Sequence, residues 1–370
     1  MTRSLLIAPQ WIGDAVMTQP LLAQCQQRGE RLTVAAMPWV APIYEAMPEC
    51  EAVLVLPFKR GALELYQRWS WARALRGQFE RAYVCPNTFK SALLALWAEI
   101  PTRLGYVGEM RRWLLTHSLA NPSKRERPSM VAFYAALVEA DRFALEHPAG
   151  RSLERSPQLV VPPNWIQSAL SSWRLTPQSY VVVAPGAEYG AAKRWPSAYF
   201  AQLCAGLDTT VVLLGSAKDQ LVSQEIVSGV EALTQGLGAA SSRPQILDLT
   251  GQTTLQQALA LVAGARGLVS NDSGLMHVAA ALGVAQVALF GSSSPLHTPP
   301  QSALAHVLWL KTQADYAGDV ACSPCFQRTC PLGHFRCMND LGVERVLPLV
   351  KAWDLPPPRE ARLSPAATSR

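Results

Sequence analysis

The segment from residue 267 to residue 290 constrains the fold of this chain more than any other. An apolar run, Gly267 to Ser270, meets a short polar turn, and an Ala-rich helix without long side chains near its start follows. The next apolar run, Val284 to Phe290, ends in a turn of one glycine and three serines. Strand, helix and strand in this order are typical of a βαβ unit, in which the two strands lie parallel.

The polar turn inside this unit has the composition of an anion-binding site. A strand–turn–helix aims several backbone N–H groups and the positive end of a helix dipole at one point, which suits a phosphate. Gly274 allows the backbone to approach a phosphate closely. Polar side chains near the same helix N-terminus come from Asp272, Ser273 and His277. The alternative is a structural role, in which Asp272 or Ser273 only caps the helix.

The same alternation of apolar runs and helical stretches fills two halves of the chain, which predicts parallel sheets wrapped by helices. In the first half we expect strands at 5–8, 32–36, 53–56 and 82–84, and helices that include 15–28 and 69–76. In the second half we expect further strands at 180–184, 210–214 and 246–249, and helices at 197–206 and 255–263.

A Pro- and Ser-rich stretch, Ser156 to Pro163, and the turn at Thr176-Pro177 bracket a short helix between the two halves. A boundary there gives one domain of residues 1–175 and a second of residues 176–354. The Pro- and Ala-rich tail, residues 355–370, is expected to be disordered. The predicted fold class is α/β, with two doubly wound, Rossmann-like domains that face a central cleft.

Composition limits the partners and the compartment. Of the 370 residues, 49% are hydrophobic and only 16% are charged, so the chain can bury large cores, and its net charge of +6 favours anionic partners. No apolar run reaches the roughly 18 residues of a transmembrane helix, and the first apolar run is too short for a signal peptide. We therefore expect a cytoplasmic protein whose eight cysteines are reduced.

A carboxylate follows the first predicted strand. Gly13 and Asp14 come just before the helix that we expect to begin near Ala15. Asp14 could act as a general base if burial raises its pKa. Without further information, a helix N-cap is the simpler interpretation.

Two cations follow the first strand of the second half. Strand 180–184 leads into a loop that contains Gly186, and Lys193 and Arg194 come next. Since the carboxyl ends of parallel strands meet at one edge of a sheet, these cations should lie over the same strand ends as Asp272 and His277. A lysine beside a helix N-terminus is suited to hold a diphosphate. The alternative is a pair of solvated surface cations.

Four of the cysteines lie close together in the sequence, at positions 322, 325, 330 and 337. Their residue type and the first spacing are typical of a four-thiolate zinc site, but the later spacings are not those of a usual zinc ribbon. We favour reduced thiols in a loop over a structural metal at Cys322, Cys325, Cys330 and Cys337. The remaining cysteines are expected to be small core residues.

Together these motifs resemble those of the family 9 glycosyltransferases, the ADP-heptose:lipopolysaccharide heptosyltransferases of Gram-negative bacteria. The resemblance rests on Gly13-Asp14, on Pro185-Gly186-Ala187 with Lys193 to Pro196, and on Asp272 to Leu275 with His277. Segments 86–91, 105–111 and 322–337 make the chain most similar to the members that add the second heptose of the core.

The resemblance implies a GT-B fold with an acceptor (lipopolysaccharide core) domain, residues 1–175, and a nucleotide-sugar donor domain, residues 176–354. It implies a metal-independent, inverting transfer of L-glycero-D-manno-heptose from ADP-heptose, without a cofactor, to the first heptose of heptosyl-Kdo2-lipid A. A heptosyltransferase I or III with another core acceptor and a non-catalytic sugar-nucleotide-binding module remain as alternatives.

Residue roles follow from the same resemblance. Asp14 corresponds to the general base, and Lys193 corresponds to the cation that stabilises the departing diphosphate. The backbone amides of three residues correspond to the phosphate-binding turn: Ser273, Gly274 and Leu275. Further donor contacts are assigned to Gly13, Gly186, Arg194, Asp219, Asp272 and His277, of which Asp219 is a loose match to a ribose-binding carboxylate.

The expected acceptor partner is the lipid A–Kdo core, met by peripheral contact with the cytoplasmic face of the inner membrane. Candidate acceptor contacts are Lys59, Arg60, Lys90 and Arg111. The basic residues of the first half either bind lipid A and Kdo anions or are ordinary solvated charges. The chain has no basic–aromatic module for nucleic acid, and no Gly-x-Gly-x-x-Gly follows its first strand as a dehydrogenase would require.

Overall fold

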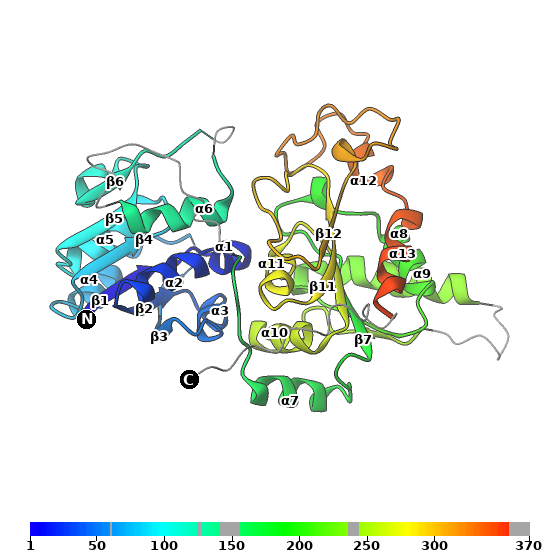
Figure 1. The fold of residues 1–370 in the computed structure, drawn as a ribbon, viewed down its shortest axis with the longest axis horizontal. Helices are drawn as coiled ribbons and strands as arrows, with labels where there is room; N and C mark the ends of the chain where they lie inside the picture. The colour runs from blue at the N-terminus through cyan, green and yellow to red at the C-terminus, as the bar shows by residue number, and fades with distance from the viewer. Residues whose placement is uncertain (60, 124–126, 141–155, 236–243, 355–370) are drawn as a thin grey trace, which may run out of the picture.

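The computed structural model describes residues 1–59, 61–123, 127–140, 156–235 and 244–354, and it contains two parallel β-sheets side by side (Figure 1). The N-terminal sheet has the strand order β3-β2-β1-β4-β5-β6. Its strands are β1 Thr2–Ile7, β2 Glu30–Ala36, β3 Cys50–Val55, β4 Arg81–Val84, β5 Thr102–Tyr106 and β6 His117–Leu119.

The C-terminal sheet has the strand order β12-β11-β10-β7-β8-β9. Its strands are β7 Tyr180–Ala184, β8 Thr210–Leu213, β9 Ile246–Asp248, β10 Gly267–Asn271, β11 Ala285–Phe290 and β12 Ala305–Trp309. Val269 of β10 pairs with Val183 of β7 and Val287 of β11, and all three side chains are fully buried. Helices cover both faces of such a sheet, which is why its central strands read as continuous apolar runs.

The strand order in each sheet predicts where a ligand would bind. The order reverses between β1 and β4 in the first sheet and between β7 and β10 in the second. Ligands of doubly wound sheets bind outside the carboxyl ends of the strands at such a reversal, because the loops diverge there and leave a crevice. The loops after β1, β4, β7 and β10 are therefore the places to look for function.

The helices connect these strands and pack over the sheets. They are α1 Ile12–Met17, α2 Gln19–Gln27, α3 Ala41–Glu45, α4 Leu65–Arg73, α5 Phe89–Trp97, α6 Met130–Ala135, α7 Pro163–Ser172, α8 Ser197–Ala205, α9 Gln220–Thr234, α10 Leu255–Gly264, α11 Gly274–Ala281, α12 Arg336–Asn339 and α13 Val343–Lys351. Short 3₁₀ turns are η1 Arg111–Leu114, η2 Ala136–Glu139, η3 Ala191–Lys193, η4 Ala217–Asp219, η5 Leu310–Thr312 and η6 Ala352–Asp354.

Several predicted boundaries are wrong. The helix predicted over 15–28 is two helices, α1 and α2, which meet at Thr18 because Pro20 begins a new first turn and has no N–H to continue the old one. The helix predicted at 69–76 begins four residues earlier, at Leu65. Strands β5, β6 and β12 were not predicted, since β5 carries polar residues and a glycine, and the other two lie at sheet edges.

The segment between the halves contacts both of them. Leu159 N donates to Ala281 O at 2.9 Å, and Val160 N donates to Ala46 O at 2.8 Å. Helix α7, which the sequence analysis assigned to the N-terminal domain, lies beside α10 of the C-terminal half (Figure 1). The chain thus crosses between the sheets before α7, and the predicted tail, residues 355–370, lies outside the described residues.

The two halves also touch at the N-termini of α1 and α11. A Cβ atom on Gly13 would lie 2.7 Å from His277 Cδ2, and one on Gly274 would lie 2.7 Å from Ile12 Cβ. Because glycine has no side chain, the backbone at each of these two helix ends packs directly against a side chain of the other helix.

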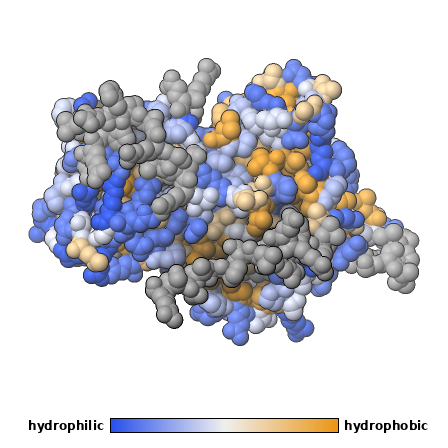
Figure 2. Space-filling model, in the orientation of Figure 1, coloured by the Kyte–Doolittle hydropathy of each residue, from blue (hydrophilic) through white to orange (hydrophobic). Residues whose placement is uncertain are grey.

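On the face shown in Figure 2, hydrophobic residues are visible mainly over the C-terminal half, and the N-terminal half is largely hydrophilic. Among the described helices, none combines the length and the hydrophobicity that crossing a membrane requires.

Candidate active site

Asp14 lies in the first turn of α1, directly beyond the carboxyl end of β1. The N-cap of this helix is Trp11, so Asp14 is not the cap. Its Oδ1 accepts a hydrogen bond from Tyr134 Oη at 3.1 Å. Burial raises the pKa of Asp14 to about 6, and the Tyr134 hydrogen bond and the nearby cations Lys193 and Arg127 oppose this rise. A carboxylate with such a pKa can accept a proton near neutral pH.

The C-terminal half contributes a buried ion pair. Lys193 Nζ lies 2.5 Å from Asp272 Oδ2, and their side chains are 18% and 5% exposed. Asn271, the last residue of β10, holds in place the loop that carries Lys193, residues 185–196, which we call the lysine loop. Its Nδ2 donates to Pro185 O at 2.8 Å, and its Oδ1 accepts from Trp195 N at 3.0 Å. The loops after β7 and β10 are thus joined at the reversal of strand order, as the sequence predicts.

The start of α11 does not match the capping alternative. Ser273 occupies the N-cap position, but its side chain makes no capping hydrogen bond, and Asp272 pairs with Lys193 instead. The backbone N–H groups of Gly274 and Leu275 therefore open the helix without a side-chain partner from the cap. Such groups, together with the helix dipole, favour an anion.

His277 lies between the two halves, with its ring against Gly13. Burial lowers its pKa to about 4; Asp272 opposes this effect and Lys193 adds to it. The imidazole is consequently neutral at neutral pH, and it can donate or accept a hydrogen bond but carries no charge.

A cavity of about 660 Å³ opens beside Asp14. Its walls come from the loops after β1 and β4, residues 8–11 and 85–88, and from helix α6. The C-terminal half adds His297 and Thr298. The lining includes Arg127, one of the basic residues of the first half, and three polar residues that no local motif marks: Tyr134, His297 and Thr298.

The basic residues that were predicted to contact the acceptor lie in different environments. Lys90 lines the cavity, whereas Lys59 is exposed and is not part of the lining. Arg60 lies outside the described residues. The prediction for Arg111 is wrong, because this side chain is fully buried: Nε donates to Tyr106 O at 2.8 Å, Nη2 donates to Asn87 Oδ1 at 3.0 Å, and Nη1 donates to a backbone carbonyl. Arg111 fixes the loop after β4 and is not among the residues that line the cavity.

Gly186 and Asp219 lie against each other behind the lysine loop. A Cβ atom on Gly186 would lie 2.6 Å from the Asp219 carboxylate. Asp219 Oδ2 accepts from Ser216 N at 2.9 Å and from Ser216 Oγ at 2.7 Å. These contacts give the carboxylate a local role at the start of α9. Arg194 is half-buried, and its Nε has no hydrogen-bond partner among the described residues.

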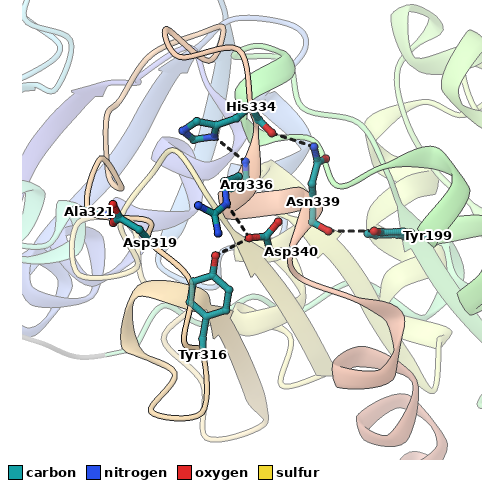
Figure 3. A network of polar contacts seen from close by, with 8 residues as sticks. All are labelled: Tyr199, Tyr316, Asp319, Ala321, His334, Arg336, Asn339 and Asp340. Carbon is teal, nitrogen blue, oxygen red and sulfur yellow. Dashed lines mark hydrogen bonds and ion pairs between the residues drawn. The ribbon is translucent and has the colours of Figure 1, made fainter.

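The cysteine-rich segment packs against the loop that carries Lys193, where Arg328 O accepts a hydrogen bond from Ala192 N at 3.0 Å. All four of its cysteines are free thiols, and among the described residues no group of three or more His, Cys, Asp or Glu side chains is arranged to hold a metal ion. A polar network around α12 anchors this segment (Figure 3). Asp340 accepts from Tyr316 Oη at 2.6 Å and from Arg336 Nε at 3.1 Å. Burial, with the other cysteines nearby, raises the pKa of Cys337 to about 11.

Comparison with known proteins identifies the family of this chain and agrees with its fold. Residues 68–336 match the profile of glycosyltransferase family 9 (heptosyltransferase). The chain is 38% identical to lipopolysaccharide heptosyltransferase 2 of Salmonella typhimurium over 318 residues, which is 83% of this chain and 88% of that protein. It is 37% identical to lipooligosaccharide heptosyltransferase 2 of Haemophilus ducreyi, with the same coverage.

Solved structures give the same result. The structure of E. coli ADP-heptose lipopolysaccharide heptosyltransferase II superposes with a TM-score of 0.76 at 34% identity, covering 95% of this chain and 98% of that one. A family 9 glycosyltransferase of Veillonella parvula superposes at 0.75 with 19% identity, covering 95% and 97%, and shows the fold alone. The predicted α/β, GT-B fold class is confirmed. The chain belongs to glycosyltransferase family 9, the heptosyltransferases.

Proposed function

We propose that this enzyme transfers L-glycero-D-manno-heptose from ADP-heptose to the first heptose of heptosyl-Kdo2-lipid A. The observation that carries the proposal is that the two halves bring a buried carboxylate, Asp14, to within electrostatic range of the Lys193–Asp272 pair. The names of the relatives support the choice of donor and of core acceptor.

In the proposed reaction Asp14 removes the proton from the acceptor hydroxyl. The acceptor oxygen then attacks the anomeric carbon of the donor as the bond from that carbon to the ADP oxygen breaks, so the configuration inverts. A pKa of about 6 keeps Asp14 ionised at pH 7 and above, while leaving it more basic than an exposed aspartate.

The leaving diphosphate gathers negative charge, which Lys193 and the amides of Ser273, Gly274 and Leu275 would stabilise. Lys193 now pairs with Asp272, so the donor phosphates would compete for an ammonium group that is already in place. Asp272 would then face the donor sugar. In this scheme the positive charge comes from the lysine and the helix N-terminus, and no divalent ion takes part.

The cavity beside Asp14 would hold the acceptor sugar. Lys90 and Arg127 lie in its wall and suit the carboxylates and phosphates of the lipid A–Kdo core. The N-terminal half is thus the proposed acceptor domain and the C-terminal half the proposed donor domain. We place the reaction at the cytoplasmic face of the inner membrane, which the protein would meet peripherally.

The decisive experiment measures ADP release from ADP-heptose by the purified protein in EDTA, with heptosyl-Kdo2-lipid A or Kdo2-lipid A as acceptor. Turnover with the heptosylated acceptor alone is the expected result. Turnover with Kdo2-lipid A would make this the enzyme for the first heptose. Absence of turnover with both acceptors, or recovery only on addition of a divalent ion, would contradict the proposal.

A further inference from the structure

We propose that Tyr134 is a positioning residue for the reaction: its hydroxyl holds Oδ1 of Asp14, so that Oδ2 is the oxygen that takes the acceptor proton. This inference rests on the proposed role of Asp14 as the base. It adds a residue that neither the sequence motifs nor the comparisons single out.

The contact joins two buried groups from distant parts of the chain. Tyr134 Oη lies 3.1 Å from Asp14 Oδ1, 120 positions away in sequence, and both residues line the cavity. Tyr134 is only 5% exposed, so water does not compete freely for the hydrogen bond. A hydrogen bond to a charged, buried acceptor is among the stronger kinds, and it fixes the direction of the carboxylate.

The tyrosine ring is itself held firmly. The Phe133 ring contacts it edge to face, with 5.6 Å between the ring centroids. The same Phe133 ring stacks on the ring of Tyr106, with 3.8 Å between their centroids. The start of α6 is capped by Ser129, whose Oγ accepts from Ala132 N at 3.2 Å. The hydroxyl of Tyr134 therefore reaches Asp14 from a short, capped helix rather than from a loop.

Helix α6 is also tied across the cleft to the donor side. Met130 N donates to His297 O at 2.9 Å. The next residue, Thr298, lies with its Oγ1 3.4 Å from Asp272 Oδ1. The helix that orients the base thus begins at a segment that touches the carboxylate paired with Lys193. One connected set of contacts links the two ends of the proposed displacement.

Several titratable and charged groups act on Asp14, Tyr134 among them. Those facing it are Tyr134 on α6, Tyr44 on α3, Cys85 after β4, Arg127, Lys193 on η3 and Asp272 after β10. Of these, Tyr134 makes the direct hydrogen bond that favours the ionised form. Without this hydroxyl, one of the interactions that oppose the effect of burial is lost, so the pKa of Asp14 should rise and the base should keep its proton to a higher pH.

The test compares Tyr134→Phe with a matched control, Tyr106→Phe. Tyr106 loses a comparably buried hydroxyl, which donates to Phe133 O at 2.6 Å and does not touch Asp14. In Tyr134→Phe the acid limb of the kcat–pH profile should move up by roughly one to two pH units. At pH 6 kcat should fall by roughly 5- to 50-fold, whereas at pH 8.5 it should stay within a few-fold of wild type. The control should leave the limb in place. A uniform loss at every pH with an unmoved limb would overturn the proposal.

A second measurement does not depend on turnover. The carbonyl band of protonated Asp14, identified by its loss in Asp14→Asn, can be titrated by infrared difference spectroscopy. Its midpoint should lie near pH 6 in wild type and should rise in Tyr134→Phe. An unmoved midpoint refutes the role of Tyr134. A moved midpoint in an enzyme that transfers no heptose refutes the proposed function alone. If Tyr134→Phe does not fold, 3-fluorotyrosine at this position, a stronger donor of the same shape, should move the midpoint downward, and a failure to do so overturns the proposal.

Discussion

Replacing Asp14 by asparagine should nearly abolish turnover and, at the same time, make the protein more stable at neutral pH. Asparagine has the same shape, and its amide oxygen can still accept the hydrogen bond that Tyr134 now donates at 3.1 Å. What the substitution removes is a buried negative charge. Active sites commonly hold such groups at a cost in stability.

The size of the gain follows from the pKa of Asp14. Burial raises it from 3.8 to about 6, a difference of roughly 2 pH units, which corresponds to about 3 kcal/mol. The folded protein therefore binds this proton more tightly than the unfolded chain does. Stability is lost as pH rises from 3.8 to about 6, and above that range the full penalty is present. Asparagine carries no such penalty at any pH.

Thermal unfolding of wild type and Asp14→Asn across pH 4 to 8 measures the effect. The two proteins should melt together near pH 4, and the variant should melt higher above pH 6.5, by roughly 4 °C if the chain unfolds as one unit. Turnover at saturating substrates should fall by about 10²- to 10⁴-fold, as expected for loss of a general base. ADP binding should persist, because Asp14 lies outside the phosphate-binding turn.

A useful contrast is Asp219→Asn. That carboxylate accepts two hydrogen bonds from Ser216, so its replacement should lower the melting temperature. For Asp14→Asn, a melting difference that does not change with pH would refute the reasoning about the buried charge. Near-normal turnover would remove Asp14 from the mechanism.

Three further changes test the rest of the site. Lys193→Ala should weaken ADP-heptose binding and lower turnover, and it should cost roughly 3 kcal/mol of stability because Asp272 is left buried and unpaired; the double variant with Asp272→Asn should melt close to wild type and stay inactive. Gly13→Ala should lower kcat/KM by roughly tenfold or more, since its new methyl would lie 2.7 Å from His277 and force the halves apart; unchanged kinetics would show that the contact opens during turnover. Arg111→Lys should destabilise the protein by about 2–4 kcal/mol in urea titrations without raising the acceptor KM, because the guanidinium serves the loop after β4; a raised KM would restore it to the acceptor site.

The main site residues that the sequence predicted lie between a strand and the next helix, or in the first turn of that helix. Asp14 comes after β1, Lys193 after β7, and Asp272 after β10. An apolar run of five or six residues locates a buried strand, and parallel topology then brings the carboxyl ends of neighbouring strands together. For these residues, local pattern and one rule of topology are enough to place them at a common edge.

The residues that were missed or misassigned have partners far away in sequence. Tyr134 meets Asp14 only because α6 packs beside α1, and nothing in its own neighbourhood distinguishes it from a core tyrosine. Arg111 sits among polar and charged neighbours, which suggested a surface cation, yet its partners are oxygens of Pro86, Asn87 and Tyr106 that only the folded sheet brings together. Long-range polar contacts of this kind leave no periodic signal in a single sequence.

The glycine contacts between the halves divide the site into a fixed part and an adjustable part. At Gly13 and Gly274 the backbone of one helix end packs against a side chain of the other, His277 or Ile12, so this close packing sets the separation of the base from the phosphate-binding turn. That separation suits a displacement in which one donor and one reacting hydroxyl must always meet at the same distance. Another wall of the cavity, residues 85–88, belongs to the loop after β4, which is separate from these two helix ends. We expect discrimination between acceptors to reside in that loop, where side chains can change without moving Asp14 relative to Lys193.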